Sequence, residues 1–210
     1  MNEISSSTKN KTHNGAKRRS AISKKAILDA TYETLCQEGF RGLTIEGIAA
    51  RAGVGKATIY RWWSTKGELS VEAFLTHITP MIEYVSTGSS RQDISMQMRR
   101  LAKTFSGKDG KIVREMLAMG QFNADTLELF KRGYLEPRRD AARKVLKQGI
   151  EQGQFRHDFD IEAIIDALYG PLYHRLLLNR PIDDERFLSS VESSVLISIL
   201  PTDTDFTSHS

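Results

Sequence analysis

The chain has 210 residues, a formal net charge of +4 at pH 7 and a single cysteine, Cys36. A lone cysteine excludes an internal disulfide and is typical of a protein from the reducing cytoplasm. No apolar run approaches the roughly 20 residues that a membrane-spanning helix needs, and the N-terminal residues lack the apolar centre of a secretory signal. We therefore expect a cytoplasmic protein with no membrane partner.

The charge is distributed unevenly along the chain. Residues 1–66 contain 12 Lys and Arg against 5 Asp and Glu, whereas residues 67–210 contain 18 against 21. A basic first third followed by a slightly acidic remainder indicates a nucleic-acid-binding module joined to a domain with another task. Helical periodicity recurs along almost the whole chain, so the predicted class is all-α.

Residues 1–20 are polar and contain few large apolar side chains, which predicts a disordered basic arm. Two roles are open for such an arm, namely extra contacts with DNA phosphates or the minor groove, and a solubilising tail. The cations available for DNA contacts are Lys9, Lys11, Lys17, Arg18 and Arg19.

A three-helix unit is predicted over residues 21–69, with its first helix running from about Ser23 to Glu38. The Ser23 hydroxyl can cap the start of the helix, and Gly39 can adopt the left-handed backbone that ends it. Small and apolar residues recur between them at the spacing of one buried helical face. These residues are Ile27, Ala30, Thr31, Thr34 and Leu35.

The segment TIEGIAARAGVGKATIYRWW, residues 44–63, fits two short helices joined by a tight turn. Thr44 can cap the first helix, Gly53 can end it without a Cβ clash, and Val54 is expected to be buried in the turn. The second helix covers about residues 56–63. This is the layout of a helix-turn-helix, whose second helix can enter the major groove of DNA.

The outward positions of that second helix combine cationic, hydroxyl and small side chains. Lys and Arg can bind phosphates or guanine edges, hydroxyls suit phosphates, and Ala or a Thr methyl can contact a thymine methyl. The alternative is an ordinary surface helix that happens to be basic, but the fit of the whole turn pattern and the local charge favour DNA binding. The outward residues are Lys56, Ala57, Thr58, Tyr60 and Arg61.

The sequence Thr-Lys-Gly-Glu at residues 65–68 is a capping box that opens a fourth helix, predicted to run to about Val85. In such a box the first and fourth residues satisfy each other's backbone amides. Lys66 lies in the first turn, where a cation and free amides can together hold a phosphate. The alternative is an exposed lysine without a ligand. Residues 70–87 are predicted to connect the two domains.

Residues 24–69 resemble the DNA-binding domain of the tetracycline-repressor (TetR/AcrR) family of transcriptional regulators. The resemblance lies in a first helix ending in EGF, followed by LTIEGIAARAGVGKATIYRWWSTKGEL. Family members usually carry Tyr-x-His-Phe where this chain has Tyr-Arg-Trp-Trp at residues 60–63, and often Ser where it has Gly55.

The resemblance also implies roles for individual residues. It implies that Thr44, Tyr60 and Lys66 hold the phosphate backbone of DNA. The resemblance also implies that the side chains of Lys56, Ala57 and Thr58 face the DNA bases. The complete expected DNA-binding set is Thr44, Gly55, Lys56, Ala57, Thr58, Tyr60, Arg61, Trp62 and Lys66.

Residues 88–202 are predicted to form a separate helical domain, followed by a flexible tail at residues 203–210. A Gly-Ser-Ser sequence marks the break before this domain. Pro137 should kink or split a helix near Glu136, because proline lacks an amide hydrogen and restricts the residue before it. Helices are predicted at about 92–105, 112–122, 125–152, 160–179 and 184–200.

The helix predicted at 160–179 is apolar on nearly every side, and the last helix carries an apolar stripe of its own. A helix without a polar face must be covered all round, either by a second subunit or within the core of a monomer. In the TetR family the two terminal helices usually form a two-fold interface, so the resemblance favours a homodimer joined by a four-helix bundle. The expected interface residues are Leu168, Leu172, Leu176, Phe187, Val191 and Val195.

Wide and deformable apolar side chains gather in the middle helices. Methionine adapts to irregular volumes and suits a pocket for variable ligands, although an ordinary core explains each residue equally well. The family resemblance implies a cavity for a small-molecule effector in this domain. The expected lining is Met96, Met116, Met119, Phe122, Phe130, Tyr134 and Tyr169.

Catalytic and metal-binding patterns are absent from the sequence. GVGKAT at residues 53–58 lacks the leading glycine of a phosphate-binding loop, and no strand is predicted before it. The five histidines show no metal-ligand spacing with one another or with Cys36, and no nucleophile elbow occurs. We expect no enzymatic activity, no metal and no cofactor.

The sequence thus predicts an all-α protein of about nine helices, with an N-terminal helix-turn-helix domain and a C-terminal ligand-binding and dimerisation domain. Its expected function is that of a ligand-responsive transcriptional regulator, a homodimeric repressor released from a palindromic double-stranded DNA operator by an unidentified small molecule. The alternative is a helical ligand-binding or scaffolding protein that no longer binds DNA specifically. The outward face of the second helix of the helix-turn-helix argues against that alternative.

Overall fold

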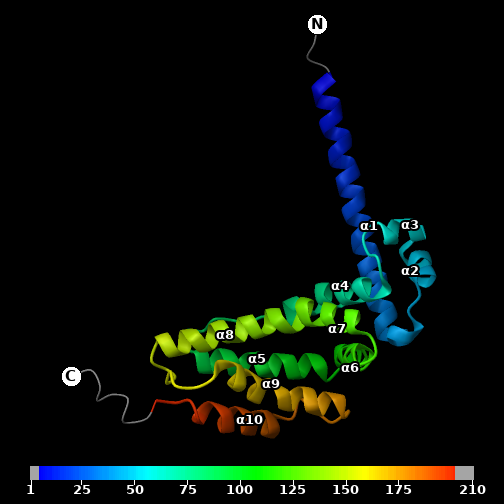
Figure 1. Cartoon of the computed structure of the whole chain (residues 1–210). Coiled ribbons are helices and arrows are strands. Elements are labelled where there is room, and N and C mark those ends of the chain that lie inside the picture. Colours follow the sequence, from blue (N-terminus) through cyan, green and yellow to red (C-terminus); the bar gives the residue numbers. More distant parts are fainter. Residues whose placement is uncertain (1–4, 202–210) are drawn as a thin grey trace. The chain divides into compact units, whose positions relative to one another are not determined.

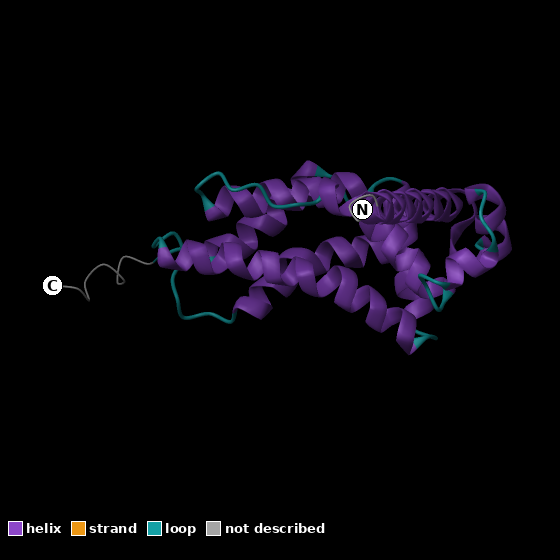
Figure 2. Ribbon diagram, turned by 90° about the horizontal axis from the view of Figure 1, so that it is seen from above, coloured by secondary structure: helices purple, strands orange, loops and turns teal. Residues whose placement is uncertain are grey.

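The computed structural model describes the backbone of residues 5–201 and the side chains of residues 20–201. Every regular element in that part of the chain is helical, which confirms the all-α prediction (Figures 1 and 2). The chain divides into two compact units, residues 1–76 and 77–210, and each unit has a core of its own. The tail predicted at residues 203–210 lies outside the described residues.

The first unit contains α1 (Ser5–Gly42), α2 (Ile45–Ala52), α3 (Lys56–Tyr60) and most of α4 (Lys66–Ile78). Helix α1 begins at Ser5 and not near Ser23, so the segment expected to be a disordered arm is largely helical in its backbone. The helix continues through this segment although Ser, Thr, Asn and Gly, which make up much of it, favour helices less than Lys, Ala and Arg do. The backbone leaves the helical conformation at Gly39, with φ of 73°, as predicted.

The predicted inward stripe of α1 forms the core of the first unit with residues from α2 and α3. Ile27, Ile48 and Ile59, one from each helix, have no exposed surface. The buried hydroxyls of Thr31 and Thr34 donate to carbonyls one turn earlier, at 2.7 and 2.8 Å. These bonds satisfy polar atoms that would otherwise be unfavourable in an apolar core.

Helix α4 ends at Ile78, earlier than the predicted end near Val85, and a short 3-10 turn follows at Thr79–Met81. Pro80 explains the difference. Proline lacks the amide hydrogen that continues a helix, and it disfavours helical backbone at the residue before it. The predicted connecting helix is therefore shorter than the 70–87 span expected from the sequence.

The second unit contains six α-helices among its described residues. The single helix predicted at 125–152 is split by a π-helical turn, Lys131–Leu135. Pro137 lies in the first turn of the helix that follows, directly after the π-helical turn. The predicted break near Glu136 is thus confirmed. The helices are α5 (Ser90–Phe105), α6 (Lys108–Gly120), α7 (Ala124–Phe130), α8 (Glu136–Glu151), α9 (Ile161–Leu177) and α10 (Glu185–Ile197).

Helix α9 buries one face inside its own chain, although its sequence is apolar on nearly every side. Leu168, Leu172 and Leu176 are between 1% and 4% exposed, because α9 packs against α5, α6, α8 and α10. This corrects the prediction that these three leucines form a dimer interface. They belong to the core of the second unit.

Helix α10 packs beside α9 (Figure 1). The chain itself partly covers the residues of α10 that were expected at the interface. Phe187, Val191 and Val195 are half-buried. The guanidinium of Arg175 lies 3.6 Å from the centre of the Phe187 ring, so this aromatic side chain is already engaged within the subunit.

Candidate functional site

The turn between α2 and α3 has the geometry that its sequence predicts. Thr44 Oγ1 accepts a hydrogen bond from the Gly47 amide at 3.1 Å, which confirms the helix cap. Gly53 ends α2 in the left-handed conformation, with φ of 65°. Val54 is half-buried and not fully buried as expected. Gly55 precedes α3 with extended backbone, and a Cβ atom there would meet no neighbour within 4 Å.

Helix α3 turns one side to the core and the other to solvent. Ile59 is fully buried, whereas Lys56, Ala57 and Tyr60 are exposed and Thr58 is half-buried. The expected base-facing side chains therefore lie on an accessible face, where they can meet a ligand without rearrangement of the core.

Lys56 is held at the start of α3 by an ion pair with Glu46 of α2, with 3.0 Å between Nζ and Oε1. The hydrogen bond in this pair raises the pKa of Lys56 and lowers the pKa of Glu46. Because both side chains are more than half exposed, solvent screens the pair. The lysine can therefore exchange this partner for a phosphate or a base edge at little cost.

A pair of tryptophans after α3 links it to α1 and α4. Trp63 is buried, and its indole Nε1 donates to Glu72 Oε2 at 2.7 Å. Glu72 also pairs with Lys24 at 2.8 Å, and the Lys24 Nζ lies 5.1 Å from the centre of the Trp62 ring. The Arg61 guanidinium lies 5.7 Å from the same ring. Trp62, 40% exposed, is thus flanked by two cations, and sequence reasoning missed the contribution of Lys24.

Lys66 turns back into the first unit. Its Nζ donates to the Phe40 carbonyl oxygen at 3.1 Å and lies 4.7 Å from the centre of the Phe40 ring. The capping box forms as predicted, since the Glu68 amide donates to Thr65 Oγ1 at 3.1 Å and Glu68 accepts from the Thr65 amide at 3.3 Å. Lys66 therefore joins the start of α4 to the end of α1, in addition to any contact with DNA.

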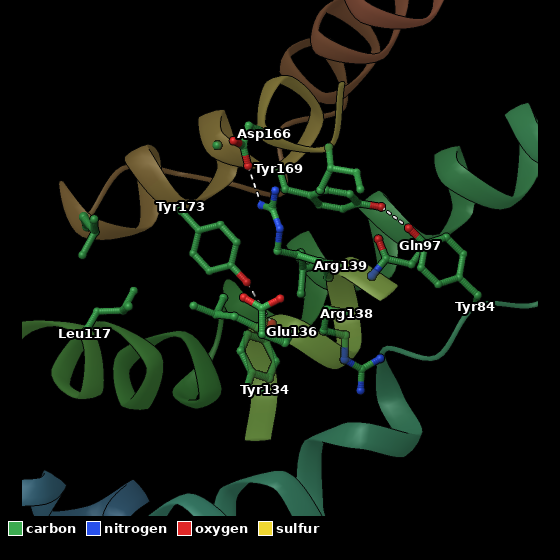
Figure 3. Close-up of a pocket in the computed structure, with 15 residues that line it drawn as sticks. Tyr84, Gln97, Leu117, Tyr134, Glu136, Arg138, Arg139, Asp166, Tyr169 and Tyr173 are labelled. Carbon is green, nitrogen blue, oxygen red and sulfur yellow. Dashed lines mark hydrogen bonds and ion pairs between the residues drawn. The ribbon is translucent and has the colours of Figure 1, made fainter. Parts of the chain in front are cut away.

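A cavity of about 530 Å³ lies within the second unit (Figure 3). Its wall combines residues from α5, α6, the π-helical turn, α8 and α9 with one residue from the segment before α5. The apolar part of the wall is Leu101, Leu117, Leu135, Ile165 and Leu177. The uncharged polar part is Tyr84, Gln97, Tyr134, Tyr169 and Tyr173.

The four tyrosines of the cavity form two hydroxyl pairs (Figure 3). Tyr84 shares a hydrogen bond with Tyr169, and Tyr173 donates to Tyr134 at 3.1 Å. Burial raises the pKa of Tyr84 and of Tyr173 to about 12, and it raises the pKa of Tyr134 and of Tyr169 well above the ordinary value. All four hydroxyls therefore keep their protons near neutral pH.

The cavity overlaps the expected ligand pocket at two residues, Tyr134 and Tyr169. Met116 and Phe130 are fully buried and belong to the core around it. Phe130 stacks on the Tyr134 ring, with 4.9 Å between ring centres, so it supports the cavity wall from behind.

The other expected pocket residues lie elsewhere. Phe122 is 91% exposed in the turn between α6 and α7, so its assignment to the pocket was wrong. The turn leaves this side chain in contact with solvent, and composition alone could not reveal this. Met96 and Met119 are half-buried and do not line the cavity.

Sequence reasoning missed most of the polar wall, including Tyr84, Gln97 and Tyr173. One signal was present. Tyr169 and Tyr173 are four residues apart, a spacing that puts both rings on one face of a helix. Gln97 and Tyr84 carry no such local signal, because folding alone brings them to the same cavity.

Among residues 20–201, whose side chains the structure describes, no group of three or more His, Cys, Asp or Glu could hold a metal ion. None of the helices in residues 5–201 is both long and apolar enough to cross a membrane.

Comparison with known proteins identifies the family. Residues 27–73 match the bacterial regulatory proteins of the tetR family, and residues 85–193 match a tetracyclin repressor-like C-terminal domain. The HTH-type transcriptional regulator YdeS of Bacillus subtilis is 40% identical over 154 residues, which is 73% of this chain and 78% of that protein. The DNA-binding transcriptional repressor TetR of Mycobacteroides abscessus is 26% identical over 177 residues, or 84% of this chain and 93% of that protein.

A solved structure agrees with these matches. The crystal structure of the TetR family transcription regulator SCO0332 superposes with a TM-score of 0.74 at 30% identity, covering 85% of this chain and 99% of that chain. The helix-turn-helix, the second helical unit and these relatives agree, and the chain belongs to the TetR family of helix-turn-helix transcriptional regulators.

Proposed function

We propose that this regulator is a repressor that binds a palindromic operator as a homodimer and leaves it when a small molecule occupies the tyrosine-lined cavity. The observation that carries the proposal is the accessible face of α3, with its cationic, small and hydroxyl side chains. The name of the Mycobacteroides abscessus relative, a DNA-binding transcriptional repressor, supports repression. The protein would act in the cytoplasm, where it meets DNA, and it would regulate rather than catalyse.

The proposed DNA contacts fall into two classes. Lys56, Ala57 and Thr58, at the N-terminal end of α3, would contact base edges in the major groove, as recognition helices do. Lys24 and Arg61 flank the exposed Trp62 ring, and two cations held close together attract backbone phosphates. Phosphate contacts set the position of the protein, whereas base contacts set the preferred sequence. Thr44, Tyr60 and Lys66 complete the proposed phosphate contacts.

A palindromic operator needs two copies of α3, about 34–36 Å apart along the DNA. We place the dimer contact on the faces of α9 and α10 that the chain leaves exposed, in place of the buried leucines. Ile197 is 61% exposed and Leu178 is 57% exposed, and a partner subunit would cover both. Small side chains beside them allow two helices to approach closely. These exposed small residues are Ala163, Ala167, Gly170, Ser190, Ser193 and Ser194.

Release from DNA requires that the effector favours a dimer whose two α3 helices no longer match the operator. A coupling free energy of about 1–3 kcal/mol changes operator affinity roughly 5- to 150-fold, so a modest difference in effector affinity between the two states is enough. The coupling is reciprocal, and operator DNA must weaken effector binding by the same factor.

The direct test is to select DNA fragments from a random pool with the purified protein and sequence them. We expect enrichment of two inverted half-sites about one helical turn or a multiple apart. Lys56→Gln should change the preferred bases, whereas Lys147→Gln, a matched change at an exposed lysine of α8, should not. A folded protein that enriches no sequence at low salt would rule out specific DNA binding. An unchanged preference in Lys56→Gln would rule out its contact with bases.

A further inference from the structure

One polar side chain in the cavity wall lacks a partner. Gln97 is 3% exposed, and within residues 20–201 no group donates a hydrogen bond to its Oε1. A buried carbonyl oxygen without a hydrogen-bond donor is unfavourable, so a ligand that supplies a donor would stabilise the complex. Gln97, Tyr84 and Tyr169 all line this cavity (Figure 3).

The neighbouring tyrosine pair offers the complementary group. Tyr84 and Tyr169 share one hydrogen bond, which uses one of their two hydroxyl protons. The other proton can be donated to an acceptor on a ligand. A single ligand hydroxyl is able to accept this proton and to donate its own proton to Gln97, whereas an ether or a ketone can only accept.

The charged residues of the wall offset one another. Arg139 Nη1 lies 2.5 Å from Asp166 Oδ1, and Arg138 donates to a backbone carbonyl at 2.8 Å. Glu136 lies on the same wall as these two arginines. A ligand carboxylate would be attracted by the two guanidinium groups and repelled by the two carboxylates. A ligand ammonium would be attracted by the two carboxylates and repelled by the two guanidinium groups. The two charges of each sign give the wall no net charge that would attract a charged ligand, which favours an uncharged ligand.

The remaining wall combines the rings of Tyr134 and Tyr173 with the aliphatic side chains named above. Phe105 lies edge-on to Tyr173 with 6.3 Å between ring centres, so the tyrosine rings are held in place from behind. Aromatic pairs gain about 0.5–1.5 kcal/mol beyond their burial when they stack or meet edge to face. A cavity of about 530 Å³ is within the roughly 300–1,000 Å³ range of small-molecule pockets. A rigid ring system loses less conformational freedom there than a flexible chain.

From these four observations we propose that the cavity binds an uncharged aromatic compound whose hydroxyl group bridges Gln97 and the Tyr84–Tyr169 pair. This rests on the proposed function, since it assigns a chemical class to the effector. Gln97 acts as the residue that selects a ligand with a donor, and the tyrosine rings select a ring system.

The test is calorimetric titration of the intact protein, without DNA, with matched compounds. Three ring scaffolds are used, namely stilbene, flavone and naphthalene. Each scaffold is tested in three forms, which carry a hydroxyl, a methyl ether or a carboxylate at the same position. On the scaffolds that bind, we expect the hydroxyl form to bind about tenfold more tightly than the methyl ether, the size of one hydrogen bond. Gln97→Leu should remove this preference while retaining affinity for the ether. Gln92→Leu, an exposed change on the same helix, should retain the preference.

The proposal fails if no scaffold binds, or if the carboxylate forms bind more tightly than the hydroxyl forms. It also fails if the flexible alcohol dodecanol binds more tightly than every ring compound. An unchanged preference for the hydroxyl form in Gln97→Leu would overturn the role of Gln97. A gel shift with selected operator DNA separates this proposal from the proposed function. If the hydroxyl compounds bind but do not release DNA, the ligand class stands and regulation by this cavity fails. If only a carboxylate binds and releases DNA, regulation stands and the ligand class fails.

Discussion

The first unit carries its candidate site on the surface, whereas the candidate site of the second unit is a cavity between its helices. Most of the proposed DNA-binding residues lie in one short stretch, residues 55–66. The cavity wall, by contrast, draws on α5, α6, the π-helical turn, α8 and α9. Substitutions on the accessible side of α3 should therefore alter binding without disturbing the core. Substitutions around the cavity should alter packing and ligand binding together. Function and stability are thus separable on the accessible side of α3 and coupled around the cavity of the second unit.

The largest effect should come from a charge in the core of the second unit. Leu172 is 2% exposed, so Leu172→Arg buries an unpaired guanidinium at a cost of several kcal/mol and should prevent folding of that unit. Ala167→Arg places the same charge on the exposed face of α9. We expect it to leave the helical fold intact and to abolish the dimer. Circular dichroism and sedimentation velocity measure the two effects.

The matched control is Ala118→Arg, on an exposed face of α6, which should stay folded and dimeric. A folded Leu172→Arg dimer would contradict the burial of α9 within its own subunit. If the Ala167→Arg protein remains dimeric, the interface does not lie on the exposed face of α9.

A moderate effect is expected at Lys66, which joins α4 to α1 and is also a proposed phosphate contact. Lys66→Met removes the 3.1 Å bond to the Phe40 carbonyl and should lower the free energy of unfolding by about 1 kcal/mol. If the lysine also binds one phosphate, the slope of log K against log salt should become shallower by about 0.9 for every DNA sequence.

Gel shifts at several salt concentrations, with urea unfolding of the same samples, distinguish the two roles of Lys66. Lys147→Met, at an exposed lysine of α8, should change neither quantity. Loss of stability with an unchanged salt slope would leave Lys66 with a structural role alone.

The smallest effect should be a pH dependence of stability. Hydrogen bonds from Arg143 and Arg139 lower the pKa of Glu162 to about 2. Because this pKa is lower in the folded state, the stabilisation is complete above the unfolded pKa near 4.5 and is lost as pH falls toward 2. Glu162 is 42% exposed, so we expect a contribution of at most about 1 kcal/mol.

Urea unfolding at pH 7 and pH 3 tests this contribution. The wild type should lose more stability between the two pH values than Glu162→Gln does. Glu151→Gln, at an exposed glutamate on α8, should behave like the wild type. Equal losses in the wild type and Glu162→Gln would mean that the arginine pairs do not stabilise the fold.

Local geometry was predictable wherever neighbouring residues determine it. The Thr44 cap, the left-handed Gly53 and the break at Gly39 each depend on one or two turns of chain, and the structure has all three. The end of α4 could also have been predicted, since Pro80 was visible and forbids a regular helix through that point. The family could be predicted because its motif lies within one such local stretch.

The cavity and the dimer face depend on packing between distant segments. Periodicity showed that α9 is apolar, but it could not show which side its own subunit covers, and Leu172 was therefore assigned to the wrong surface. Phe122 and Phe130 look alike in the sequence, yet one is 91% exposed and the other fully buried. Tyr84 and Tyr169 are 85 residues apart, and no local pattern relates them.

Tyr134 lies in the π-helical turn Lys131–Leu135. Each backbone hydrogen bond of a π-helix spans one residue more than in an α-helix. Each α-helical residue turns the chain by about 100°, so deletion of a single residue there would rotate the following side chains by that angle relative to α7. A change in length at this turn would therefore re-aim cavity side chains without replacing any residue of the wall. A one-residue alignment gap at this turn should then separate relatives that share this cavity wall from relatives that recognise a different class of effector.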